Sequence, residues 1–228
     1  MTRKRIARLA TAAATVLAGV AFAVTGPTAA HAAVPGPCES QGAGIFVDFS
    51  GAAAGVVFVG GPLDDVIIGS PFADIIDGGG GNDVIVGNGG PDTLQGDNVA
   101  GQFPGLDNIT GSDGADLING NECADVANGA AGPDTVVGGP GPDLVNGGDD
   151  NDIVGGADGN DQVNGELGMD DVYGGNGVDN LTGGPGNDYL DGGPGDDTIS
   201  GQAGMLDEAD DAVGANVCDA STEILTNC

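Results

Sequence analysis

The feature that most constrains this chain is a nine-residue repeat between residues 60 and 200. Fifteen units fit this stretch, the first beginning at Gly60 and the last at Gly192. Position 6 is aspartate and position 8 is aliphatic in all of them, Ala127 being the smallest position-8 residue. Position 4 is glycine in eleven units, the exceptions being Leu63, Phe72, Cys123 and Asp150. An acidic, glycine-rich chain without tryptophan is otherwise typical of disorder, but three positions kept in phase over this length indicate a regular solenoid.

The chemistry within one unit predicts how the solenoid is wound. Gly, Asn and Asp at positions 1 to 6 favour a sharp turn, and the three residues at positions 7 to 9 favour a short strand with position 8 inward. Two units then make an 18-residue turn with two facing strands and two opposite loops. We therefore expect an all-β, parallel β-roll (a β-helix or solenoid). Residues 99–104 read as a six-residue insertion that forms a surface loop and leaves the flanking phase unchanged.

The same winding sorts the position-6 aspartates into two rows, one on each loop edge. One row holds Asp65, Asp83, Asp107, Asp125, Asp143, Asp161, Asp179 and Asp197. The other holds Asp74, Asp92, Asp116, Asp134, Asp152, Asp170 and Asp188. Neighbours in a row lie on successive turns, where they repel each other unless a cation lies between them. Carboxylate and carbonyl oxygens suit Ca²⁺ better than Mg²⁺, which needs a tighter octahedron, or Zn²⁺, which prefers His or thiolate.

This pattern resembles the RTX, or haemolysin-type, calcium-binding nonapeptide repeat GGxGxDxUx. The full GGxGxD pattern occurs in the units that begin at Gly78, Gly138, Gly174, Gly183 and Gly192. The resemblance implies a right-handed parallel β-roll with Ca²⁺ between successive loops, held by position-6 aspartates and loop carbonyls, at no more than about 13 sites. The loops of Leu63, Phe72, Cys123 and Asp150 match least well. Family repeats commonly follow an enzyme or toxin domain, which we do not find in this chain, so the resemblance implies no catalytic activity.

Residues 1–32 have the composition of a secretory signal peptide. A basic start precedes an apolar run, and Ala30-His31-Ala32 fits the cleavage pattern, so we expect a secreted, extracellular product cleaved near Ala32. The four basic residues and the single histidine all lie in this segment, so cleavage changes the formal net charge from −31 to −35. A chain without cations is a poor partner for nucleic acid or anionic membranes. It also has no His, Lys or Arg for catalysis, so we expect no enzyme.

The segments outside the repeats are expected to close the roll. Residues 33–59 are predicted to form an N-terminal cap that covers the outward Val66, Ile68, Ile75, Val84 and Val86, and residues 201–228 to form a C-terminal cap. The even set Cys38, Cys123, Cys218 and Cys228 predicts disulfides in an exported chain, with three possible connectivities. Of these we favour Cys218–Cys228, which closes a short loop, and therefore Cys38–Cys123.

Taken together, the sequence predicts an exported calcium-binding protein in which calcium is structural and acts as a folding switch. The alternative is a calcium-dependent adhesion module for extracellular polysaccharide or another surface. Its candidate contact surface is a ladder of outward position-9 residues, Thr110, Asn128, Asn146, Asn164, Thr182 and Ser200. An enzyme that uses paired carboxylates, as glycosidases do, is the least favoured of the three readings because the repeat already accounts for nearly all carboxylates.

Overall fold

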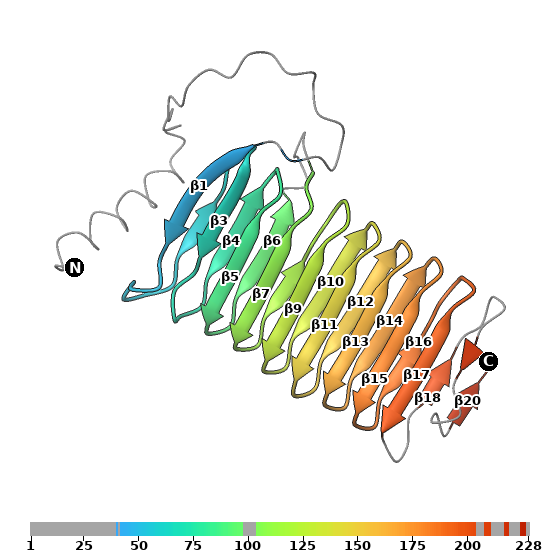
Figure 1. The fold of residues 1–228 in the computed structure, drawn as a ribbon. Helices are drawn as coiled ribbons and strands as arrows, with labels where there is room; N and C mark the ends of the chain where they lie inside the picture. Colours follow the sequence, from blue (N-terminus) through green and yellow to red (C-terminus); the bar gives the residue numbers. More distant parts are fainter. Residues whose placement is uncertain are drawn as a thin grey trace.

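The fold is a parallel β-solenoid built from two ten-stranded sheets (Figure 1). It was obtained as a computed structural model that describes residues 40, 42–97, 104–203, 208–210, 217–218 and 224–226. Consecutive strands alternate between the sheets, so each strand pairs with the strand two places along the chain. The all-β, parallel solenoid predicted from the repeat is therefore confirmed.

The bounds of the strands follow the repeat. The first sheet contains β1 (Ala43–Asp48), β3 (Asp64–Ile68), β5 (Val84–Gly89), β7 (Asn108–Asp113), β9 (Val126–Ala131), β11 (Leu144–Asp149), β13 (Gln162–Leu167), β15 (Asn180–Pro185), β17 (Thr198–Ala203) and β19 (Val217–Cys218). The second sheet contains β2 (Val57–Val59), β4 (Ile75–Gly79), β6 (Thr93–Asp97), β8 (Leu117–Asn119), β10 (Thr135–Pro140), β12 (Ile153–Asp158), β14 (Asp171–Asn176), β16 (Tyr189–Asp191), β18 (Glu208–Asp210) and β20 (Ile224–Thr226).

The register confirms the 18-residue turn. Val145 of β11 pairs with Val163 of β13, one turn later, and every position-8 side chain stacks on its counterpart in this way. Across the insertion Ile85 pairs with Ile109, so the extra residues leave the phase of the flanking strands unchanged. Most of the insertion, residues 99–103, lies outside the described residues.

The position-8 side chains form the core. All fifteen, from Ile67 to Ile199, are at most 1% exposed. At the N-terminal end the column continues into Phe49 and Phe58, whose rings lie 5.5 Å apart and are tilted by 60°. Because position 8 recurs at every ninth residue, each half-turn places one aliphatic side chain into the space between the sheets.

The strands are longer than the sequence predicted. Most of them cover six residues, positions 7 to 9 of one unit and 1 to 3 of the next, and only positions 4 to 6 turn; β11 is an example. Position 2 bends the strand with a positive φ, as at Gly148 (121°) and Ala157 (86°), yet these residues keep their partners one turn away. Pairing between turns therefore extends the strand through the glycine pair that local turn chemistry assigned to the loop.

The ends of the roll also differ from expectation. β1 and β2 extend the two sheets beside β3 and β4. Of the five outward side chains predicted to be covered, Ile75 and Val84 remain 53% and 40% exposed, whereas Val66, Ile68 and Val86 are half-buried. At the other end β18, β19 and β20 continue both sheets beyond residue 200. The predicted signal peptide, residues 1–32, lies outside the described residues. Within the part of the chain that the structure describes, no helix is long and apolar enough to cross a membrane.

Candidate metal centre

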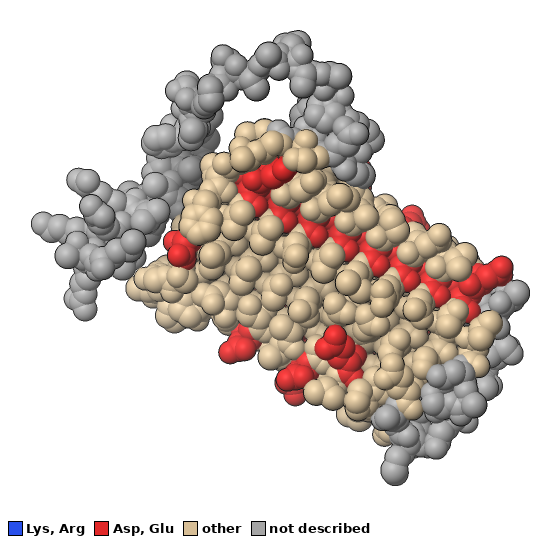
Figure 2. Space-filling view, viewed as in Figure 1, with Lys and Arg blue, Asp and Glu red and all other residues tan. Residues whose placement is uncertain are grey.

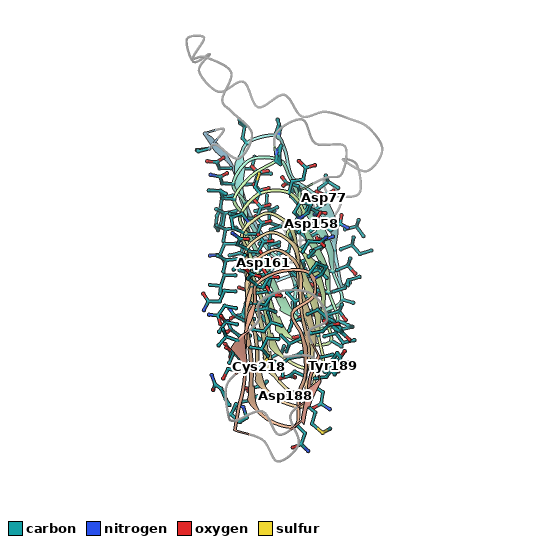
Figure 3. The ribbon with its side chains drawn as sticks, turned by 90° about the vertical axis from the view of Figure 1, so that its right-hand side faces the viewer. Asp77, Asp158, Asp161, Asp188, Tyr189 and Cys218 are labelled. Carbon is teal, nitrogen blue, oxygen red and sulfur yellow. The ribbon has the colours of Figure 1, made fainter. Side chains whose placement is uncertain are left out.

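The position-6 aspartates lie in two buried rows, as their spacing predicted. All fifteen are at most 4% exposed, because each follows the turn at positions 4 and 5 and its side chain points back into the loop. Figure 2 shows a line of acidic side chains that follows the length of the roll, with no basic side chain on the described part of that face. Figure 3 labels one member of each row, Asp161 and Asp188.

One oxygen of each carboxylate links two turns of the roll. The backbone N–H of Asp125 donates to Oδ1 of Asp143 at 2.7 Å, and that of Asp143 donates to Oδ1 of Asp161 at 2.9 Å. The same bond joins Asp170 to Asp188 at 3.0 Å and Asp179 to Asp197 at 2.8 Å. Each aspartate therefore interacts with a neighbour of its own row, one turn away, and not with the next aspartate in the sequence.

The second oxygen is buried and lacks a partner through most of the roll. Among the described residues, no hydrogen-bond donor reaches Oδ2 of eleven of these aspartates, namely Asp83, Asp92, Asp107, Asp116, Asp125, Asp134, Asp143, Asp152, Asp161, Asp170 and Asp179. Buried polar atoms are nearly always paired in native proteins, and a buried carboxylate oxygen is especially costly to leave unpaired. Each of these atoms is thus a place where a cation is expected.

The first turn is an exception with a visible cause. Oδ2 of Asp65 accepts the N–H of Gly61, and Oδ2 of Asp74 accepts the N–H of Ser70, both at 2.6 Å. These are the units that carry Leu63 and Phe72 at position 4. Their carboxylates are fully hydrogen-bonded by the protein, so they offer no free oxygen to an ion.

The other two irregular loops keep the geometry of the regular ones. Cys123 and Asp150 stand in place of the position-4 glycine, and both adopt the positive φ that glycine favours, 92° and 82° respectively. Oδ2 of the following Asp125 and Asp152 consequently stays buried without a donor from the described residues. The four irregular loops thus differ in structure: two leave Oδ2 of the aspartate without a donor from the described residues, and two do not.

The position-1 glycines complete each pocket. A Cβ built on Gly165 would lie 2.6 Å from Oδ2 of Asp170 and 2.7 Å from the carbonyl oxygen of Gly183, one turn later. The absence of a side chain therefore brings a carboxylate oxygen and a backbone carbonyl oxygen to the same point. No group of three or more His, Cys, Asp or Glu side chains converges within the described ranges, so an ion here would take part of its ligand set from backbone carbonyls.

Burial perturbs the acidity of these carboxyls. Burial raises the pKa of Asp83 and of Asp125 to about 8; the backbone N–H that each accepts lowers it, and neighbouring carboxylate charges raise it. The same causes raise the pKa of Asp92 and Asp152 to about 7. The metal-free roll therefore favours protonated carboxyls, and a divalent cation would remove that preference by compensating the charge.

Comparison with known families decides what kind of repeat this is. The model of the RTX calcium-binding nonapeptide repeat matches four times, at residues 59–94, 103–136, 128–163 and 173–204, which together cover more than half of the chain. The chain belongs to the RTX calcium-binding repeat family. No curated protein matches the chain. Calcium is the ion that RTX repeats bind, and the oxygen-only pockets of this RTX roll fit that ion.

One buried carboxylate of the RTX roll was missed by the sequence reasoning. Asp97 occupies position 2 of its unit, is 3% exposed, and both of its oxygens accept the N–H of Gly105, at 3.2 and 3.3 Å. Burial raises its pKa to about 7, with further contributions from the charges of Asp125, Glu122 and Asp77 against the lowering effect of the Gly105 N–H. An acidic residue in a glycine position, two residues before the insertion, was the available signal.

Proposed function

We propose that calcium binds between successive loops of the roll and is required for it to fold. In each site Oδ2 of a position-6 aspartate and the carbonyl oxygen of a position-1 glycine one turn later would act as ligands. The observation that carries this proposal is the set of eleven buried Oδ2 atoms without a donor from the described residues. Because the sites lie between turns, binding and folding are coupled, and calcium acts as a folding switch in the exported protein.

Magnitudes support a requirement rather than a modest stabilisation. An unpaired buried polar atom costs about 1–3 kcal/mol, so eleven cost about 11–33 kcal/mol. A typical domain is stable by only about 5–15 kcal/mol. Without the ions this cost is comparable to or larger than the whole stability of the fold.

A calcium titration of the purified protein tests the proposal, with magnesium as the control ion. We expect circular dichroism to show strand content appearing with calcium, and the radius of gyration to fall from about 47 Å towards the about 16 Å of a compact chain of this length. Magnesium should act weakly because it tolerates irregular oxygen ligands poorly. Full strand content in a chelator at about pH 8.5, where the buried carboxyls of Asp83 and Asp125 are ionised, would refute a calcium requirement.

Export and disulfide formation belong to the same proposal. Neither Cys123 nor Cys218, the cysteines in the described part of the chain, is a free thiol. Their proposed partners, Cys38 and Cys228, lie outside the described residues, so the pairs Cys38–Cys123 and Cys218–Cys228 remain proposals. Peptide mapping of the unreduced secreted protein should recover these two pairs, and mass spectrometry should find an N-terminus near residue 33.

A role in adhesion is the second candidate, and one structural feature favours it. The position-9 residues from Thr110 to Ser200 occupy one row across strands β7 to β17, in register from strand to strand. Within this row Nδ2 of Asn164 donates to Oδ1 of Asn146 at 2.8 Å, which fixes both amides. Such a flat polar row could bind extracellular polysaccharide. Calcium-dependent retention on immobilised polysaccharide, absent from a variant with Asn146 and Asn164 changed to Ala, would support this role.

Catalysis is not part of the proposed function. The RTX repeat is a calcium-binding structural unit, and in this roll the carboxylates of both rows are engaged in links between turns. A screen of glycan substrates should detect no turnover. Hydrolysis of any glycan by the calcium-loaded protein would contradict this assignment.

A further inference from the structure

Asp97 does not follow the plan of the repeat. Position 2 elsewhere carries a glycine or a residue with positive φ in most units, but Asp97 is not among the positive-φ residues. Its backbone stays in the sheet, where it pairs with Gly79 of the preceding turn, and its carboxylate lies inside the loop against the N–H of Gly105. The repeat therefore has one loop with two inward carboxylates, those of Asp97 and Asp107.

Ser70 shows what a position-2 side chain does when it turns into the loop. Its hydroxyl donates to Oδ1 of Asp74 at 2.8 Å and accepts the N–H of Phe72 at 3.2 Å. Asp97 accepts the corresponding position-4 N–H, that of Gly105, but an ionised carboxylate has no proton to donate to its neighbour. At position 2, Ser70 thus donates a hydrogen bond to the aspartate of its loop, whereas Asp97 adds a second negative charge to a loop that already holds the carboxylate of Asp107.

The carboxylates of Asp97 and Asp107 belong to the same loop, where Asp97 accepts the N–H of Gly105. Burial raises the pKa of Asp107, and the negative charge of Asp97 helps to raise it further. A Cβ on Gly96, the residue before Asp97, would collide with Oδ2 of Asp107 and would lie 2.5 Å from the carbonyl oxygen of Gly120. Oδ2 of Asp107 belongs to a side chain that is 2% exposed, and it receives no hydrogen bond from the described residues. A buried oxygen without a donor and a carbonyl oxygen therefore meet beside Gly96, in the loop that also holds the carboxylate of Asp97.

We propose that Asp97 and Asp107, with the carbonyl oxygen of Gly120, form a calcium site that binds more tightly than the other sites of the roll. This inference rests on the proposed calcium function. Calcium affinity rises with the number of charged ligands, and two carboxylates from a single loop neutralise the charge of a divalent ion without a carboxylate from the next turn. Asp97 and Asp107 lie on either side of the insertion in the sequence.

Calorimetric calcium titration of Asp97→Asn and of Asp97→Ser tests the proposal. We expect the wild-type protein to show one site tighter than the rest, and both variants to weaken that site by about tenfold or more while leaving the others unchanged. Serine is the residue that the roll itself carries at this position in the unit of Ser70, so this variant is expected to fold. Glu166→Gln is the matched control: Glu166 is also an acid at position 2, but it is exposed and its φ is +75°.

The outcomes separate this inference from the proposed function. If the wild-type protein binds no calcium, both are wrong. If it binds calcium but the tightest site survives in both Asp97 variants, or is weakened equally by Glu166→Gln, the special site is wrong and the general function stands. Circular dichroism in saturating calcium confirms that each variant is folded before its affinities are compared.

Discussion

The position-1 glycines give the sharpest test of the pocket geometry, through a pair of glycine-to-alanine substitutions. Gly165 lies at position 1 in β13, where an added Cβ would be 2.6 Å from Oδ2 of Asp170 and 2.7 Å from the carbonyl oxygen of Gly183. Gly155 lies in β12 at position 9, where the nearest atoms to an added Cβ are those of Tyr173 at 3.9 Å. Neither glycine has a positive φ, so the substitutions differ in the space available and not in backbone strain.

The expected magnitudes differ in sign. At Gly155 alanine fits at ordinary van der Waals distance and restricts the unfolded chain, so Gly155→Ala should stabilise the roll by about 0.4–1 kcal/mol. At Gly165 the same change must push apart a carboxylate and a backbone carbonyl, and overpacking of this kind costs about 1–3 kcal/mol. The displaced Oδ2 of Asp170 is also a proposed calcium ligand, so one site should be lost.

Urea unfolding in saturating calcium and calcium titration measure the two effects. The midpoint for Gly165→Ala should fall with little change in the slope, and its calcium stoichiometry should be about one ion lower. The midpoint for Gly155→Ala should stay unchanged or rise. Equal stability of the two variants, or full stoichiometry in Gly165→Ala, would show that the space beside Gly165 is not a calcium pocket.

Two further predictions concern protonation and backbone strain. Burial raises the pKa values of Asp83 and Asp125 from 3.8, the value for a free carboxyl, to about 8. Protonation of these two carboxyls therefore stabilises the metal-free roll at low pH, and this stabilisation is lost as the pH rises through about 8. Circular dichroism in chelator should therefore show more strand at about pH 5 than at about pH 8.5, and the opposite trend would contradict the burial of these carboxyls. Ala157 has a φ of +86°, which costs about 1–2 kcal/mol for a residue with a Cβ, so Ala157→Gly should raise the stability by about 0.5–1 kcal/mol after the added chain entropy. Ala115→Gly, at an exposed position without positive φ, should lower the stability by about 0.4–1 kcal/mol, and unfolding midpoints that fail to move in opposite directions would contradict the strain argument.

Much of this architecture could be predicted from the sequence because the repeat has a fixed period. Two nine-residue units form one turn, so position 8 always points inward, and Ile85 must stack on Ile109 once the insertion is recognised. The same arithmetic separates Asp188 from Asp197 and pairs each with the aspartate one turn before it. These results depend only on counting along the chain.

Other features, such as the length of the strands and the exposure of outward side chains, depend on contacts between turns, which the period of the repeat does not predict. Strand β11 continues through Gly147 and Gly148 because Gly148 and Asp149 pair with the next turn, although the local chemistry of the glycines favours a bend. The exposure of Ile75 and Val84 follows from β1 and β2 lying beside the first turn, where they lengthen the sheets instead of covering them.

The sequence by itself determined the fold class, the two rows of aspartates and the chemical class of the ion, because periodicity fixes direction and residue type fixes ligand chemistry. Only the tertiary structure decided which carboxylates keep a buried oxygen without a hydrogen-bond donor among the described residues. Oδ2 of Asp74 accepts the N–H of Ser70, whereas no donor among the described residues reaches Oδ2 of Asp92, one turn later. That difference arises from the path of the backbone around each loop, which positions or withholds a single N–H group. The hydrogen bonding of Oδ2 therefore differs between Asp74 and Asp92, although both occupy position 6 of the repeat.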